Sequence, residues 1–97
     1  MKELKKVLVV CAMGYGSRHI IRENVEKTLH ALSIYGVEVQ YTDVLSARAG
    51  IADVIVCGAD IKERCERLGP IVALSNLFDI DELRDKLKTH LESRKFL

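Results

Sequence analysis

The chain has 97 residues, of which 48% are hydrophobic and 30% are charged, and its formal net charge is +1. This composition is typical of one soluble globular domain with a modest core, and it excludes a disordered chain. A net charge so close to zero gives no reason to expect binding to nucleic acid or to an anionic membrane surface. We therefore expect residues 1–97 to form a single domain.

The N-terminal segment and the cysteines indicate a compartment. Residues 1–6, MKELKK, are charged and lead directly into a short apolar run, unlike a secretory signal peptide. No apolar run approaches the ~20 residues that span a bilayer. Cys11, Cys57 and Cys65 lie in different segments, with neither CxxC nor zinc-ligand spacing. We expect a cytoplasmic protein with free thiols, without insertion into a membrane and without a metal or other cofactor.

Four segments are predicted to be β-strands. The segment 4–11 contains the continuous apolar run 7–10, and 54–57 repeats this pattern, which is typical of central strands that are buried on both faces. The segment 71–74 is the predicted fourth strand. The segment 37–42 alternates between apolar and polar residues, which is typical of an edge strand with one face in water.

The segments between these strands are predicted to be helical. The first helix should follow Ser17 as its N-cap, carry Ile20 among its apolar positions and stop at Gly36. A short helical turn is expected at 45–49 and a short helix at 61–68.

The last helix has the clearest boundary signals. Asp79 begins a capping box with acidic residues in the first turn, and the inner stripe is formed by Ile80, Leu83, Leu87 and Leu91. The alternation of strands and helices predicts an α/β fold. We expect a three-layer domain with a four-stranded parallel sheet in the order 2-1-3-4 and helices on both faces.

Cys11 is the candidate nucleophile. In such a sheet, ligands bind at the carboxyl ends of the strands, where the strand order reverses beside the first strand. Cys11 closes that strand, and Gly14 and Gly16 follow in a loop that leads into a helix. The glycines allow close backbone approach, so the N–H groups of this loop can converge on an anion and favour a thiolate. The candidate phosphate-binding residues are Ala12, Met13, Gly14, Tyr15, Gly16, Ser17 and Arg18. An anion-binding loop of this kind suits phosphoryl transfer.

Other interpretations of the same residues remain open. Cys11 could be a buried structural cysteine, since cysteine is among the most buried residue types. Gly14-Tyr15-Gly16 begins like a dinucleotide loop, with Asp43 after the second strand, but His19 occupies the position of the third glycine. Cys57 could approach Cys11 as a resolving thiol, although a packed core cysteine is the favoured interpretation. The third thiol is assigned no role.

The pattern Cys11-x-x-Gly14-x-Gly16-Ser17 at the end of a first strand resembles the enzyme IIB components of the bacterial sugar phosphotransferase system. The likeness is greatest to the galactitol, ascorbate and lactose types. This resemblance implies that Cys11 takes a phosphoryl group from a phosphohistidine of the IIA component. It further implies transfer of that group to a sugar bound by the membrane IIC component, so the expected partners are IIA and IIC. Docking should centre on the loop, where Met13 and Tyr15 could form an apolar rim.

The loop also departs from related patterns. Ala12 stands where many IIB relatives carry glycine, and Arg18 stands where serine or threonine is common. Low-molecular-weight tyrosine phosphatases and arsenate reductases use a Cys-x5-Arg loop, but here Ser17 holds the arginine position. No Asp-Pro pair is present to supply a leaving-group acid, since the one proline, Pro70, follows Gly69. Such an enzyme is the alternative function, and a regulatory binding module on the same fold is a further one.

Overall fold

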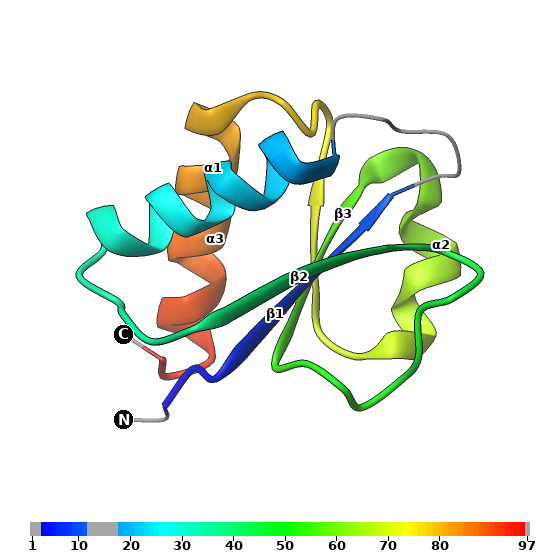
Figure 1. The fold of residues 1–97 in the computed structure, drawn as a ribbon, viewed down its shortest axis with the longest axis horizontal. Coiled ribbons are helices and arrows are strands. Elements are labelled where there is room, and N and C mark those ends of the chain that lie inside the picture. Colours follow the sequence, from blue (N-terminus) through cyan, green and yellow to red (C-terminus); the bar gives the residue numbers. More distant parts are fainter. Residues whose placement is uncertain (1–2, 12–17, 97) are drawn as a thin grey trace.

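The computed structural model of the chain describes residues 3–11 and 18–96, with the Arg18 side chain left out (Figure 1). Its elements alternate along the chain as the sequence predicts. They are β1 (Lys6–Cys11), α1 (Arg18–Ala31), β2 (Glu38–Asp43), β3 (Val54–Gly58), η1 (Ala59–Ile61), α2 (Lys62–Cys65), η2 (Glu66–Leu68), β4 (Ile71–Leu74) and α3 (Ile80–Ser93), where η denotes a 3-10 helix.

The strands form a four-stranded sheet in the order β2-β1-β3-β4, and each neighbouring pair is parallel. The predicted fold class and strand order are therefore confirmed. In the register of the sheet, Cys11 lies beside Asp43 of β2, and Val10 lies beside Cys57 of β3. The long helices α1 and α3 cover one face, and the short segment η1-α2-η2 covers the other (Figure 1).

Two hydrophobic cores lie on opposite faces of the sheet because successive side chains of a strand point to opposite sides. Val7, Val9 and Cys11 pack in the first core with α1 and α3. Leu8 and Val10 pack in the second core with the segment 59–68. Burial of a Val or Leu side chain contributes about 1.5–3 kcal/mol to the stability of the fold. Each face of the sheet gains this stabilisation only if helical segments cover it, so both cores require the full three-layer arrangement.

Strand β2 is the predicted edge strand. It begins at Glu38, and its inward-facing Val39 is half-buried against the first core. Tyr41 remains 38% exposed, with the Arg22 guanidinium of α1 lying 5.6 Å from its ring centroid. The Arg22 side chain thus covers this edge with its aliphatic stem, and the face of the Tyr41 ring attracts its cationic guanidinium.

The sequence places the end of α1 too late. The helix ends at Ala31, before the stop that is predicted at Gly36. Ser33, with φ of 61°, takes the left-handed conformation that closes the helix. The Ile34 amide then donates to the Leu29 carbonyl at 2.8 Å, as in a Schellman closure. Gly36, with φ of 75°, instead turns the chain into β2. The expected Ser17 N-cap lies outside the described residues.

Two short segments also differ from their predictions. At 45–49 there is a single turn and no helix: the Ala47 amide donates to the Asp43 carbonyl, and the Asp43 carboxylate takes the Ser46 amide. Asp43 thus acts as an N-cap residue does, but the described residues after Ala47 do not continue this turn into a helix. The predicted helix at 61–68 is a four-residue α-helix between two 3-10 turns.

Ile20 and Ile80, predicted to face the core, are 41% and 42% exposed. Both belong to the first turn of their helix. The stripe of α3 is buried only from Leu83 onward, because its first turn projects past the ends of the strands (Figure 1). No helix among residues 3–11 and 18–96 has the length and apolar composition needed to cross a membrane.

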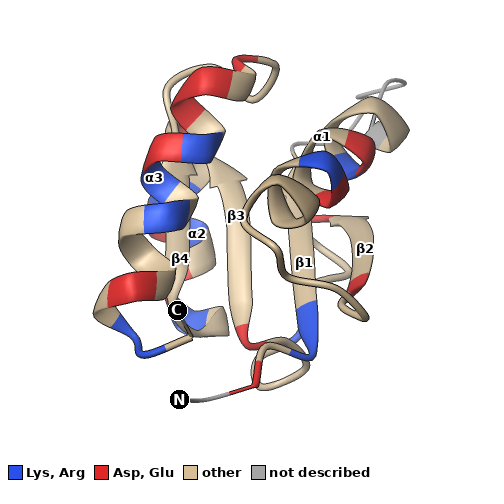
Figure 2. Ribbon diagram, turned by 90° about the vertical axis from the view of Figure 1, so that its left-hand side faces the viewer, with Lys and Arg blue, Asp and Glu red and all other residues tan. Residues whose placement is uncertain are grey.

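Charged residues lie mainly on the helices and at the ends of the strands (Figure 2). On α3 both signs alternate, and Arg84 pairs with Asp81 at 3.3 Å. The predicted N-cap Asp79 is confirmed, since its carboxylate accepts the amides of Asp81 and Glu82 at 3.1 Å each. The predicted capping box is not formed, because the Asp79 amide donates to the Asn76 carbonyl. These exposed pairs each contribute little to stability, whereas the cap fixes where α3 begins.

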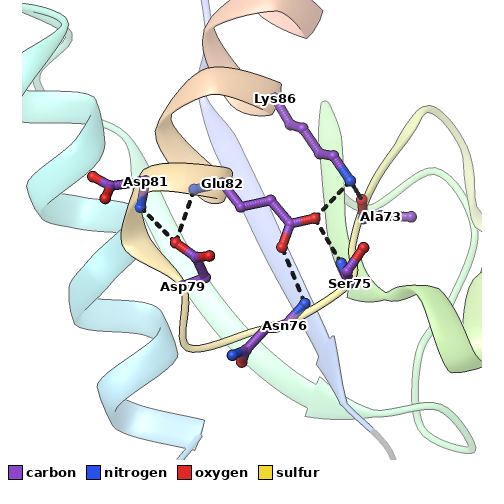
Figure 3. Close-up of polar contacts among 7 residues, drawn as sticks. All are labelled: Ala73, Ser75, Asn76, Asp79, Asp81, Glu82 and Lys86. Atoms are coloured by element: carbon purple, nitrogen blue, oxygen red, sulfur yellow. Dashed lines mark hydrogen bonds and ion pairs between the residues drawn. The ribbon is translucent and has the colours of Figure 1, made fainter.

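Glu82 fixes the loop between β4 and α3 (Figure 3). Its two carboxylate oxygens accept the amides of Ser75 at 2.7 Å and Asn76 at 3.0 Å. Lys86 lies 2.6 Å from the same carboxylate and donates to the Ala73 carbonyl of β4 at 3.1 Å. The first turn of α3 is thus tied to the carboxyl end of β4.

We expect Glu82→Gln to lower the urea midpoint of unfolding at pH 7, because one amide oxygen cannot replace two carboxylate oxygens. The hydrogen bond from Lys86, followed by those from Ser75 and Asn76, lowers the pKa of Glu82 from 4.5 to about 2. A lowered native pKa stabilises the fold above the unfolded pKa, and this contribution is lost as pH falls from 4.5 toward 2. The two proteins should therefore converge toward pH 2.

The matched control is Asp85→Asn. Its carboxylate is 79% exposed and lies 3.8 Å from Arg84, so a small difference without this pH dependence is expected. Urea unfolding followed by circular dichroism from pH 2 to 7 measures both variants. A gap between wild type and Glu82→Gln that stays constant with pH would contradict the role of the carboxylate.

Candidate functional site

The carboxyl ends of all four strands meet at one edge of the sheet. β1 ends at Cys11, β2 at Asp43, β3 at Gly58 and β4 at Leu74. Helix α1 begins at Arg18 beside this edge (Figure 1). The structure therefore places Cys11 where the sequence predicts a ligand site, on a central strand where the strand order reverses.

Cys11 is fully buried and its side chain belongs to the first core, under α1. It is the last residue of β1. Most of the predicted phosphate-binding residues lie outside the described residues: Ala12, Met13, Gly14, Tyr15, Gly16 and Ser17. Only the backbone of Arg18 is described, as the first residue of α1.

The two long helices differ in the charge at their N-termini. The first turn of α1 contains no acidic residue, and His19 there is exposed. The first turn of α3 contains Asp81 and Glu82 and is capped by Asp79. A helix N-terminus carries a partial positive charge of roughly half a unit. At α3 the protein's own carboxylates offset that charge, whereas the first turn of α1 leaves it available to an anion near Cys11.

Asp43 is the in-register neighbour of Cys11 on β2. Its carboxylate accepts the Ser46 amide at 2.7 Å, which holds the turn that follows β2. The sequence singled out Asp43 only as part of a dinucleotide pattern. Its position beside Cys11 follows from the register of β1 and β2, which the sequence does not specify.

The ends of β3 and β4 form the other part of the edge. A Cβ atom on Gly58 would lie 2.4 Å from Asp60 Oδ1, so a larger residue at this position would require the Asp60 side chain to move. A hollow of about 200 Å³ lies here, bordered by residues 58, 60 and 74–78. The loop that Glu82 holds therefore shapes one wall of the same edge.

The other two thiols lie away from Cys11. Cys57 is fully buried in the second core, whereas Cys11 belongs to the first core on the opposite face of the sheet. The favoured interpretation of Cys57 as a packed core cysteine fits this position, and the resolving-thiol alternative does not. Cys65, which the sequence left without a role, is also fully buried in the second core.

Comparisons with known proteins agree with this architecture. The family model described as the lactose/cellobiose-specific IIB subunit of the phosphotransferase system matches residues 6–89. A solved structure, the lactose-specific IIB component domain of the phosphoenolpyruvate:carbohydrate phosphotransferase system from Streptococcus pneumoniae, is similar with a TM-score of 0.56 and 25% identity. The alignment covers 94% of this chain and 97% of that one. No curated protein matches the chain.

The matched segment extends from the first residue of β1 into α3, so it contains the whole sheet and the Cys11 edge. The resemblance to IIB components is thereby confirmed, and among the three types named from the sequence the match is to the lactose type. The members of this family are phosphotransferase components that relay a phosphoryl group during sugar uptake and generally work with IIA and IIC components. The chain belongs to the lactose/cellobiose-specific IIB family of the sugar phosphotransferase system.

Proposed function

We propose that this chain is a phosphocysteine carrier whose nucleophile is Cys11. The thiol accepts a phosphoryl group from a phosphohistidine of a IIA component and passes it to a sugar bound by a membrane IIC component. The observation that carries the proposal is the position of Cys11, at the carboxyl end of a central strand beside the N-terminus of α1, whose first turn contains no acidic residue. Membership of the IIB family supports the same direction of transfer.

Each half of the relay exchanges one bond to phosphorus. The Cys11 sulfur attacks the phosphorus of the phosphohistidine, so the S–P bond forms as the P–N bond breaks. A sugar hydroxyl oxygen then attacks the same phosphorus, so an O–P bond forms and the thiolate is restored. In this proposal the backbone amides of residues 12–18 hold the phosphoryl oxygens, Ser17 adds a hydroxyl donor and Arg18 adds a cation. Positioning and charge stabilisation supply most of the catalysis of such transfers.

Membership of the IIB family also favours a phosphocysteine carrier over the alternative function, a phosphatase or arsenate reductase. A phosphatase or arsenate reductase needs an acid for the leaving group, and the sequence contains no Asp-Pro pair to supply it. A relay protein benefits from lacking such an acid, because hydrolysis would waste the phosphoryl group. We propose a lactose- or cellobiose-type sugar, in place of a galactitol- or ascorbate-type one, and a cytoplasmic location where the thiols remain reduced.

A small apolar surface lies at the same end of the molecule. Phe78 is 47% exposed, and Ile20 and Ile80 are exposed at the first turns of α1 and α3. Helices α1 and α3 pack against the same face of the sheet, and both begin at the edge that carries Cys11 (Figure 1). We propose that these three side chains contact the IIA component. The expected rim of Met13 and Tyr15 lies outside the described residues.

Cys11→Ser should fold normally but lose transfer from phosphorylated IIA to sugar, because the change is small while the hydroxyl is a far weaker nucleophile. The measurement is sugar phosphorylation with membranes that contain IIC. Cys57→Ala is the matched control, and it should retain transfer because its side chain lies on the opposite face of the sheet. Full transfer by Cys11→Ser would overturn the assignment.

Phe78→Ser should leave folding intact and weaken productive docking of IIA roughly tenfold, the equivalent of about 1.4 kcal/mol, as expected for one aromatic contact in a small interface. The apparent KM for phosphorylated IIA measures this effect. Tyr35→Ser is the control, because Tyr35 is 69% exposed but lies between α1 and β2, away from the Cys11 edge. Equal KM values for wild type and Phe78→Ser would exclude this surface.

A further inference from the structure

A carboxylate that has no role in the account so far lies at the edge of the sheet that carries Cys11. Asp60 is the second residue of η1, directly after β3, and it is exposed. Its carboxylate occupies the space that a Cβ atom on Gly58 would take, so the glycine lets it lie against the end of β3. Within residues 3–11 and 18–96, no hydrogen bond or ion pair engages this carboxylate.

The carboxylate lies on the same face of the sheet as Cys11. The register pairs Val10 of β1 with Cys57 of β3. The next residues on the two strands, Cys11 and Gly58, are therefore neighbours. Leu74, the register partner of Gly58 on β4, belongs to the first core, as Cys11 does. Because neighbouring strands lie ~4.8 Å apart and side chains in register share a face, the carboxylate stands one strand spacing from Cys11.

The same carboxylate borders the hollow of about 200 Å³ at the ends of β3 and β4. Ser75 and Asn76 form another part of its wall, and Glu82 fixes their backbone amides (Figure 3). Phe78, which belongs to the surface proposed to contact IIA, lines the hollow as well. Typical pockets for small molecules are larger, at about 300–1,000 Å³, so this hollow suits one ring of a partner's side chain rather than a disaccharide.

The charge of Asp60 indicates which ring fits. An unpaired carboxylate beside a proposed phosphoryl site repels the phosphoryl group unless a hydrogen-bond donor or a cation engages it. During the first transfer, the phosphohistidine of IIA must reach this edge. One nitrogen of its imidazole is bonded to phosphorus, and the other can carry a proton, which a carboxylate accepts as a hydrogen bond.

We propose that Asp60 binds the phosphohistidine imidazole of IIA through the ring nitrogen that is not bonded to phosphorus. This inference rests on the proposed function and adds a residue that contacts the phosphoryl donor. As the Cys11 thiolate forms the S–P bond, the P–N bond breaks and its electron pair stays on the ring nitrogen. A protonated ring then leaves as neutral imidazole, with its other N–H still held by Asp60. An unprotonated ring would leave as an anion, so a carboxylate that favours the protonated ring speeds the transfer.

The test measures the two half-reactions of Asp60→Asn separately, in single turnovers with radiolabelled phosphate. Asp60→Asn should lower the maximal rate of transfer from saturating phosphorylated IIA to Cys11 about tenfold, because one unit in the imidazole pKa is a tenfold change in its protonated fraction. Transfer from phosphorylated Cys11 to sugar, with membranes that contain IIC, should keep its rate. Asp60→Glu should recover part of the first rate, because it restores the carboxylate.

Glu63→Gln is the matched control, because it removes an equal charge from an exposed position of α2 outside the residues that border the hollow. It should leave both half-reactions unchanged. An equal or faster first transfer by Asp60→Asn would overturn the inference, since that is the result expected if the carboxylate only repels the phosphoryl group. Slowing of the second half-reaction alone would also overturn it, by assigning Asp60 to the sugar.

The maximal rate separates this role from simple docking. A higher KM for phosphorylated IIA with an unchanged maximal rate would make Asp60 a part of the docking surface, as proposed for Phe78, and would overturn its contact with the imidazole. Failure of the wild-type chain to become phosphorylated on Cys11 would instead refute the proposed function itself. The two ideas therefore fail in different measurements.

Discussion

Parallel pairing of the four strands is the constraint on which the rest of the structure depends. Because the strands are parallel, the carboxyl end of every strand lies at the same edge of the sheet, and each connection between strands crosses one face of the sheet. Cys11 therefore ends beside the N-terminus of α1 without any special local geometry among the described residues. The Glu82 carboxylate extends the same arrangement to the β4–α3 loop, which borders that edge.

Successive side chains of a strand point to opposite faces of the sheet, and this alternation places the thiols in two different cores. Cys11 belongs to the core under α1 and α3, while Cys57 and Cys65 belong to the core under the segment 59–68. The sheet therefore separates the proposed nucleophile from the other two thiols. The position of each thiol relative to the sheet, rather than cysteine content, determines what it can do.

The sequence predicts the elements whose signals are local and strong. The apolar runs of β1 and β3 could only be central strands, and Asp79 fixes the start of α3 through its own side chain. The position of Cys11 at the carboxyl end of a central strand could likewise be predicted, because ligand sites have a known place in this fold. These features require no knowledge of which side chains meet.

Features that depend on tertiary contact could not be predicted in this way. Ile80 carries the right spacing for the core, but the first turn of α3 extends past the sheet and leaves it exposed. Ser33 rather than Gly36 closes α1, because the closure is set by where the helix stops packing. The burial of Cys65 in the same core as Cys57 depends on how the segment 59–68 folds over the sheet.

The measurement that tests the central claim most directly is mapping of the phosphoryl group by mass spectrometry after reaction with phosphorylated IIA. The account predicts this group on Cys11, in tryptic peptide 7–18, whereas its presence on His19, in peptide 19–22, or on another residue would contradict it.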